Sequence, residues 1–167
     1  MYFFTADEHF AHKNIIKYAN RPFSSVEQMD EEIIKRHNEV VGKNDIVIHA
    51  GDFTLKHKNK AYECINKLTG NHIFLMGSHD YWMNSGNQIW EKKIEGIYVV
   101  VCHYAMRTWA RSHYNSWNLY GHSHGRLDPI GKQWDIGVDN NNFYPVSFES
   151  LKKIMRDRPD NPNLIRR

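Results

Sequence analysis

Short apolar runs that end in aspartate or histidine recur along this chain, and they limit its possible folds more than any other feature. Runs at residues 2–6, 45–50 and 72–76 predict buried strands. Polar turns follow these strands, and helical patterns follow the turns. This alternation is typical of an α/β protein.

The helical patterns lie between and after the predicted strands. The clearest one, at residues 24–41, places Met29, Ile33 and His37 at steps of four, with Ser24 and Glu27 as a capping pair. Other helices are predicted at residues 12–19, 59–68 and 147–155. Further strands are predicted at 97–104, 118–120 and 134–139. For the later half, one mixed sheet and a two-sheet sandwich flanked by helices both fit.

Length and composition favour one small intracellular domain. The 167 residues predict a single domain at 1–155, followed by a charged tail at 156–167 that is expected to fray. No apolar run is long enough for a membrane span, and no signal peptide is recognised. Cys64 and Cys102 have no metal-ligand spacing and are expected to be reduced thiols in the cytoplasm. The oligomeric state is left open.

The polar residues after the strands are the candidate functional residues. In α/β sheets, ligands bind in the crevice at the carboxyl ends of the strands. Carboxylates and neutral imidazoles without thiolates suit Mn, Fe, Zn, Ni or Co. The sequence therefore predicts a metal site formed by these strand ends, whose residues are Asp7, His9, Asp52, His79, Asp80, His103, His122 and His124.

Each of these short motifs also has a structural explanation. D-x-H and H-x-H triplets arise by chance in a chain with 11 histidines, and Gly-Asp after a strand is usually a turn. The remaining histidines are expected at the surface or in the core: His12, His37, His49, His57, His72 and His113. The ordered set is harder to explain by chance than any single member.

That ordered set stands as "DEH", "GDFT", "GSHD", "CHY" and "GHSH". It resembles the blocks of the calcineurin-like metallophosphoesterase superfamily, in particular a small stand-alone bacterial and phage branch. The resemblance implies an α-β-β-α sandwich, in which two mixed sheets are flanked by helices. It also implies a centre with two divalent transition-metal ions, manganese being the preferred one.

The resemblance assigns a role to each matching residue. Asp7, His9 and His124 would hold the first ion, Asp52 would bridge both, and His103 and His122 would hold the second. His79 would protonate the leaving group, with Asp80 orienting its imidazole. Arg107, four residues beyond His103, is our own candidate for a phosphate clamp.

Ser78 departs from the superfamily pattern, which has asparagine at this position. Because a serine hydroxyl is shorter and a poorer neutral ligand than an amide oxygen, weaker occupancy of the second ion and slower turnover are expected.

Three functions remain open on these grounds. The first is a metal-dependent phosphoesterase that hydrolyses a phosphodiester or phosphomonoester with a metal-activated hydroxide. Its substrate would be a small phosphate ester, a nucleotide or a nucleic-acid end, and the aromatic segments 81–90 and 106–117 either stack a base or pack internally. The second is a non-catalytic, metal-bearing module that binds a phosphorylated partner. The third, a nucleic-acid-binding protein, is least favoured because the net charge is only +3.

Overall fold

The computed structural model describes residues 1–163, and its strands form two mixed sheets of four strands each within that range. The first sheet has the order β3-β2-β1-β8, formed by Asn71–Phe74, Ile46–His49, Tyr2–Thr5 and Val146–Ser147. The second has the order β4-β5-β6-β7, formed by Ile89–Ile94, Ile97–Cys102, Trp117–Tyr120 and Gln133–Asp135. The prediction of two mixed sheets flanked by helices is therefore confirmed.

Each sheet contains three parallel strands and one antiparallel edge strand. In the first sheet β1, β2 and β3 are parallel, and β8 runs antiparallel to β1. In the second sheet β5, β6 and β7 are parallel, and β4 runs antiparallel to β5. A parallel bridge between Ala6 and Gly137 joins the end of β1 to the segment after β7. This bridge brings the carboxyl ends of the two sets of strands together.

The main core lies between the facing sheets. Phe4 and Ile48 of the first sheet belong to one buried cluster with Val99, Val101 and Leu119 of the second. Residues on both faces of β1, β2, β5 and β6 are mostly buried, which accounts for the continuous apolar runs in these segments.

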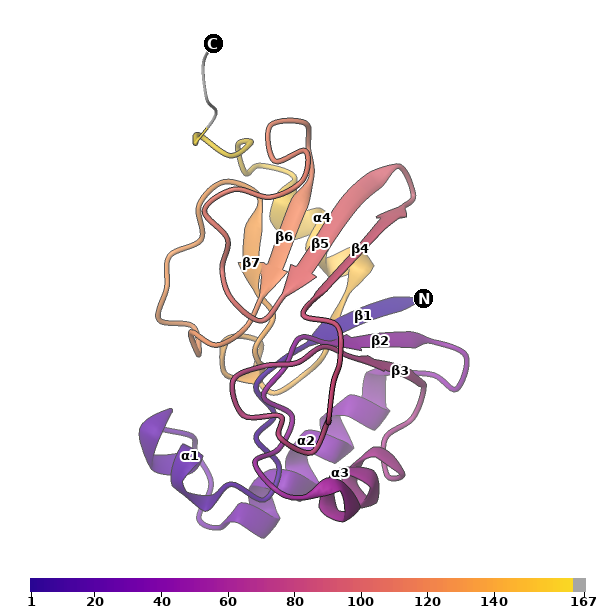
Figure 1. Ribbon diagram of the computed structural model, residues 1–167, viewed down its shortest axis with the longest axis vertical. Coiled ribbons are helices and arrows are strands. Elements are labelled where there is room, and N and C mark those ends of the chain that lie inside the picture. Colours follow the sequence, from indigo (N-terminus) through magenta and orange to yellow (C-terminus); the bar gives the residue numbers. More distant parts are fainter. Residues whose placement is uncertain (164–167) are drawn as a thin grey trace.

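The helices cover the outer sides of the sandwich. Figure 1 shows α2 (Val26–Val40) and α3 (Lys58–Ile65) beside the first sheet, and α4 (Phe148–Met155) behind β5 and β6. The short helix α1 (Lys13–Tyr18) and the 3-10 helix η1 (Val138–Asn140) complete the described elements.

Helix α2 begins slightly later than the sequence pattern indicates. Ser25, rather than Ser24, is its N-cap, and its hydroxyl accepts a hydrogen bond from the backbone N–H of Gln28 at 3.2 Å. Met29, Ile33 and His37 form the buried face of the helix, as their spacing predicts.

Strand β4 was not predicted, for a physical reason. Its sequence, IWEKKI, carries charged residues on an edge strand whose residues are mostly exposed. An edge strand with one paired side does not need a continuous apolar face. A search for apolar runs therefore does not detect this strand.

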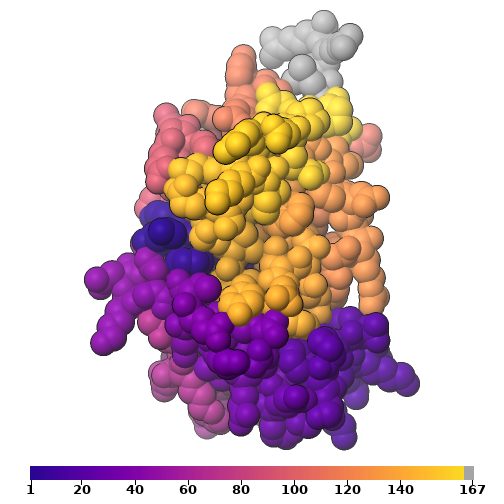
Figure 2. Space-filling model, turned by 180° about the vertical axis from the view of Figure 1, so that it is seen from behind, coloured from indigo at the N-terminus to yellow at the C-terminus, as the bar shows by residue number. Residues whose placement is uncertain are grey.

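The beginning of the C-terminal tail is attached to the domain rather than frayed. The N–H of Asn161 donates to the carbonyl of Ser112 at 3.0 Å, and Arg158 Nε donates to the carbonyl of Gly131 at 2.7 Å. In Figure 2 the C-terminal segment, in yellow, covers part of the back of the molecule. The rest of the predicted tail, residues 164–167, lies outside the described residues.

Two further predictions concern the cysteines and membrane-spanning segments. Cys64 and Cys102 are buried and unpaired. Among residues 1–163, no helix combines the length and the apolar character that crossing a bilayer requires.

Candidate metal centre

The predicted metal ligands come together as two groups of three. Side-chain ligand atoms lie within 4.8 Å of one another in each group. The first group is Asp7, His9 and His124, and the second is Asp52, His103 and His122. These are the two sets that the sequence resemblance assigns to two metal ions, and they come from the loops after β1, β2, β5 and β6.

Asp52 lies between the two groups. One of its carboxylate oxygens, Oδ2, is 3.7 Å from His9 Nε2 in the first group and 3.4 Å from His103 Nε2 in the second. A ligand that bridges two ions must be within reach of both sets. Asp52 occupies such a position.

Two ring nitrogens in the centre are buried without a hydrogen-bond partner in the described part of the chain. They are His9 Nε2 and His103 Nε2, the same atoms that face Asp52. Burying a polar atom without a partner costs free energy, so such atoms call for a ligand. A metal ion in each ligand group would satisfy these nitrogens, and the residues present therefore fit a metal centre.

Hydrogen bonds on the other ring nitrogens set the tautomers that metal binding needs. His103 Nδ1 donates to the carbonyl of Ala50 at 2.8 Å, and His124 Nδ1 donates to the carboxylate of Asp139 at 2.6 Å. Each ring therefore keeps the lone pair on Nε2 for a ligand. Such partners commonly orient metal-binding histidines.

Backbone conformation also distinguishes the candidate ligands. Five of the six have φ between 48° and 66°, in the left-handed region that non-glycine residues seldom adopt: Asp7, His9, Asp52, His122 and His124. Such strain persists only where surrounding contacts impose it, and it concentrates at functional sites. One such contact runs from the N–H of His122 to the carboxylate of Asp7, at 2.8 Å.

Glycines allow the close approach of these loops. A Cβ added at Gly121 would lie 2.6 Å from Cβ of Ala6 and 2.7 Å from Oδ2 of Asp7. A Cβ at Gly77 would lie 2.4 Å from Oδ1 of Asp52. A side chain at either position would displace a carboxylate of the centre.

Asp7 of the first group is buried close to three other carboxylates. Burial and the carboxylates of Asp52, Asp135 and Glu8 raise the pKa of Asp7 well above its ordinary value. Because the folded state holds this proton more tightly than the unfolded state does, ionisation of Asp7 lowers stability as the pH rises above about 4. A bound cation would remove this penalty.

The neighbouring groups are already in the protonation states that ligands require. Burial lowers the pKa of His9 to about 3, so its imidazole is neutral at neutral pH. Burial alone would raise the pKa of Asp52, but His103 and His9 hold it below the ordinary value. Asp52 is therefore a carboxylate at neutral pH.

The residues of the "GSHD" block have different positions. The hydroxyl of Ser78 donates to Oδ2 of Asp52 at 3.0 Å. The His79 side chain is 43% exposed, and its Nε2 lies 4.0 Å from the same oxygen. Both residues therefore face the centre.

Asp80 makes other contacts than the one with His79 that the resemblance implies. Its carboxylate accepts hydrogen bonds from four donors, namely the N–H groups of Asp52, Phe53 and Gly77 and the indole of Trp82. Within residues 1–163 it makes no hydrogen bond to His79. Asp80 holds the loop after β2 in place, and thereby positions Asp52 rather than His79.

Arg107 is exposed, and in residues 1–163 its guanidinium makes no hydrogen bond or ion pair. Only its carbonyl is engaged, by the amide of Asn161 at 2.9 Å. Its assignment as a phosphate clamp stays a prediction.

Sequence reasoning missed a buried ion pair under the first group. The Arg21 side chain is fully buried and binds both carboxylate oxygens of Asp139 at 2.8 Å, while Asp139 in turn holds His124. The same guanidinium donates to the carbonyls of Asp7 and Glu8. No local sequence pattern predicts this ion pair, because its two residues are 118 positions apart in the sequence.

Asp139 is expected to tune metal affinity through His124. Replacing it with asparagine (Asp139→Asn) removes the charge that fixes the imidazole, and loss of such a partner typically weakens metal binding about 10- to 100-fold. Titration calorimetry with Mn²⁺ measures the change. The exposed Asp128 provides the control, because it belongs to neither ligand group and Asp128→Asn removes the same charge. Equal affinity of the Asp139 variant and the wild type would contradict the assignment.

Three of the histidines set aside in the sequence form a separate cluster. His49 binds Glu8 through Nδ1 at 2.7 Å and His72 through Nε2 at 3.0 Å, and His37 lies against both rings. His37 and His49 are buried, as core residues would be. None of the three belongs to either ligand group.

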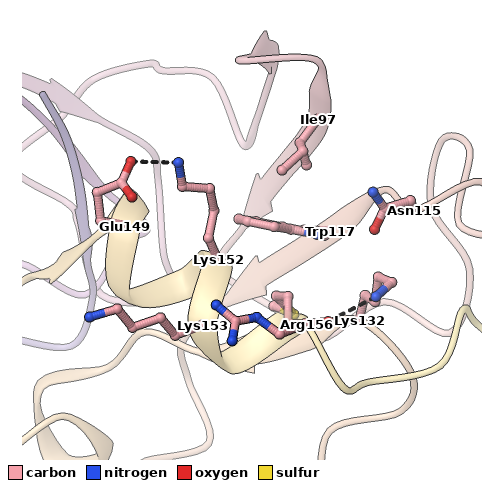
Figure 3. Close-up of a pocket in the computed structure, with 9 residues that line it drawn as sticks. Ile97, Asn115, Trp117, Lys132, Glu149, Lys152, Lys153 and Arg156 are labelled. Carbon is pink, nitrogen blue, oxygen red and sulfur yellow. Dashed lines mark hydrogen bonds and ion pairs between the residues drawn. The ribbon is translucent and has the colours of Figure 1, made fainter.

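A pocket of about 500 Å³ lies apart from the metal centre. Figure 3 shows that α4 and the first residues of β5 and β6 supply much of its wall. None of the candidate metal ligands lines it. Its lysines are partly engaged: Lys152 pairs with Glu149 at 2.7 Å, and Lys132 donates to the carbonyl of Met155 at 2.8 Å. The chemistry of the side chains, not the size of a hollow, therefore identifies the centre.

Comparison with known proteins shows similarity to a curated relative and to several solved structures, two of which are described below. The chain is 34% identical over 159 residues to the uncharacterized protein MJ1445 of Methanocaldococcus jannaschii, covering 90% of this chain and 88% of the relative. No protein-family model matches.

The solved structures concern the fold. A protein of unknown function from Aquifex aeolicus, AQ665, superposes with a TM-score of 0.72 at 22% identity, covering 92% of this chain and 98% of that one. A Vps29 single mutant from Entamoeba histolytica gives a TM-score of 0.48 at 17% identity, covering 95% and 80%. The Aquifex structure shows that the fold occurs elsewhere as a chain of nearly the same extent.

Proposed function

The chain belongs to the family of protein MJ1445 of Methanocaldococcus jannaschii, and we propose that it is a metal-dependent phosphoesterase of the calcineurin-like type. The observation that carries the proposal is the pair of ligand groups with Asp52 between them and buried, unpartnered nitrogens facing Asp52. We further propose cytoplasmic action on a small phosphate ester, a nucleotide or a nucleic-acid end. The two unpaired, buried cysteines fit a reducing compartment.

The donor set supports two divalent transition-metal ions. It contains carboxylate oxygens and imidazole nitrogens but no thiolate, which suits manganese first and Fe, Zn, Ni or Co as alternatives. When bound, such ions supply a water of lowered pKa and positive charge beside a phosphate. Asp7, His9 and His124 would hold one, Asp52, His103 and His122 the other.

The chain's own residues provide the rest of the chemistry. His79 is partly exposed and faces Asp52, so its imidazole can donate a proton to the leaving oxygen of a bound ester. His122 is exposed, so the second group is open to a ligand from solution. Asp80 and Gly77 keep Asp52 in place, since Asp80 accepts from the backbone of both.

A non-catalytic module that binds a phosphorylated partner is the second candidate. Ser78 favours it, because its hydroxyl donates to the carboxylate that would bridge the ions and so competes for that oxygen's lone pairs. The shared feature of both candidates is a phosphate group held at the metal centre.

Hydrolysis of bis-p-nitrophenyl phosphate separates the two candidates. Mn²⁺ is expected to support turnover, and a chelator to abolish it. The variant Ser78→Asn is expected to bind the second ion more tightly and to turn over faster, because an amide oxygen is the better neutral ligand.

The readouts are the rate and the Mn²⁺ content of the purified protein. Metal binding without hydrolysis in either form would favour the binding module, and failure to bind metal at all would exclude both candidates. An unchanged rate and metal content in Ser78→Asn would contradict the role given to Ser78.

A further inference from the structure

Two tryptophans of the aromatic segments, Trp82 and Trp109, do not offer a ring face for base stacking. Trp82 and Trp109 are 9% and 8% exposed. Their indole N–H groups are engaged internally, with Asp80 at 2.9 Å and with the carbonyl of Ser116 at 3.2 Å. These side chains pack within the protein, as the alternative reading of the segments predicts.

An exposed aromatic ring instead lies directly beside the metal centre. Tyr104 follows His103, and its ring centroid is 4.8 Å from that of His103 and 4.7 Å from that of His122. The ring is inclined by 73° and 65° to the two imidazoles, so these are edge-to-face contacts that hold its orientation. Both imidazoles belong to the second ligand group.

Tyr104 is also partly exposed to solvent. It is 49% exposed, although it is a large aromatic residue next to buried His103. Its hydroxyl makes no hydrogen bond within the part of the chain that the structure describes. A half-exposed ring held in a defined orientation loses little conformational freedom when a second planar group stacks on it.

Two further imidazoles that are at least partly exposed lie near the first ligand group. The rings of His79 and His12 have centroids 5.8 and 5.2 Å from that of His9. Tyr104 contacts only the second group among the ligands. An ester bound across both groups would thus have imidazole groups near one ion position and an aromatic surface near the other.

We propose that Tyr104 forms a stacking subsite for the planar base of a nucleotide-type substrate whose phosphate lies at the metal centre. The inference rests on the proposed function, since it requires a phosphate held by the two ligand groups. It adds a substrate class: phosphate esters that carry a nucleobase are favoured over those that carry only a sugar or an alkyl group.

The test measures binding to the full-length, Mn²⁺-loaded protein by titration calorimetry. The probes are 5′-phosphonate analogues of adenosine monophosphate and of ribose 5-phosphate, in which a C–P bond replaces the ester. They differ by the base and are not hydrolysed at the ester position. The wild type is expected to bind the base-containing probe roughly 10-fold more tightly, within the range that base–aromatic stacking provides.

The variants assign this preference to the ring. Tyr104→Ala is expected to remove the preference and to leave the affinity for the ribose probe and for Mn²⁺ within about 2-fold, whereas Tyr104→Phe keeps it. Tyr114→Ala removes another exposed tyrosine (74% exposed) and is expected to change nothing. Melting temperatures establish that each variant is folded.

Failure of the stacking subsite and failure of the proposed function would give different results. If wild type and Tyr104→Ala bind both probes equally well, the stacking subsite is wrong and the phosphate site stands. If neither probe binds the metal-loaded protein and bis-p-nitrophenyl phosphate is not hydrolysed, the proposed function fails and the subsite fails with it.

Discussion

Asp52→Asn is expected to lower metal-dependent hydrolysis by roughly 100- to 1,000-fold, the loss typical when one preorganised charged group is removed from an active site. The substitution keeps the shape of the side chain, and the amide oxygen can still accept from the N–H of His79, which now bonds Oδ1 at 2.8 Å. It removes the negative charge that lies within 4 Å of a histidine of each ligand group. Bound Mn²⁺ per chain is therefore expected to fall together with the rate.

The control for Asp52 is an exposed carboxylate distant in sequence. Asp157→Asn has the same charge change outside both ligand groups and is expected to keep the wild-type rate and metal content. Retention of more than about a tenth of the rate by Asp52→Asn, with unchanged metal content, would show that Asp52 does not join the two groups.

Arg21→Met is expected to destabilise the metal-free protein by about 3–5 kcal/mol, because it leaves the carboxylate of Asp139 buried without its cation. Arg21 is fully buried and Asp139 is nearly so, with 7% of its side chain exposed. The carbonyls of Asp7 and Glu8 lose their donors as well. For a chain of this size the melting temperature should fall by about 6–20 °C.

Removing both charges separates the ion pair from simple packing. Arg21→Met combined with Asp139→Asn leaves no unpaired charge, and is expected to recover part of the lost melting temperature. Lys35→Met, at a side chain that is 64% exposed, should change it little. An unaltered melting temperature in Arg21→Met would contradict the buried-pair assignment.

Several elements of the fold follow from local sequence patterns. The strand-end positions of Asp7, Asp52 and His122 are visible because buried strands are apolar and the turns after them are not. Helix α2 is visible because Met29, Ile33 and His37 repeat with the helical period. The register that places six ligand candidates at one edge then follows from parallel pairing of β1 with β2 and of β5 with β6.

Other predictions could not be settled by local patterns. The resemblance implies that Asp80 orients His79, yet the carboxylate of Asp80 accepts hydrogen bonds from Asp52, Phe53 and Trp82. Arg21 and Asp139 carry no periodic signal, since one follows a short helix and the other lies in a 3-10 turn. Strand β4 was missed because an edge strand tolerates charge on both faces.

The sequence by itself therefore determined the order of strands and turns and the identity of the candidate metal ligands, because these depend on periodicity and on residue chemistry over a few positions. Only the tertiary structure decided which distant residues support those ligands and which aromatic ring is exposed beside them. The physical reason is that these properties depend on contacts between distant segments, such as Arg21 with Asp139, and on burial, which separates Trp82 and Trp109 from Tyr104.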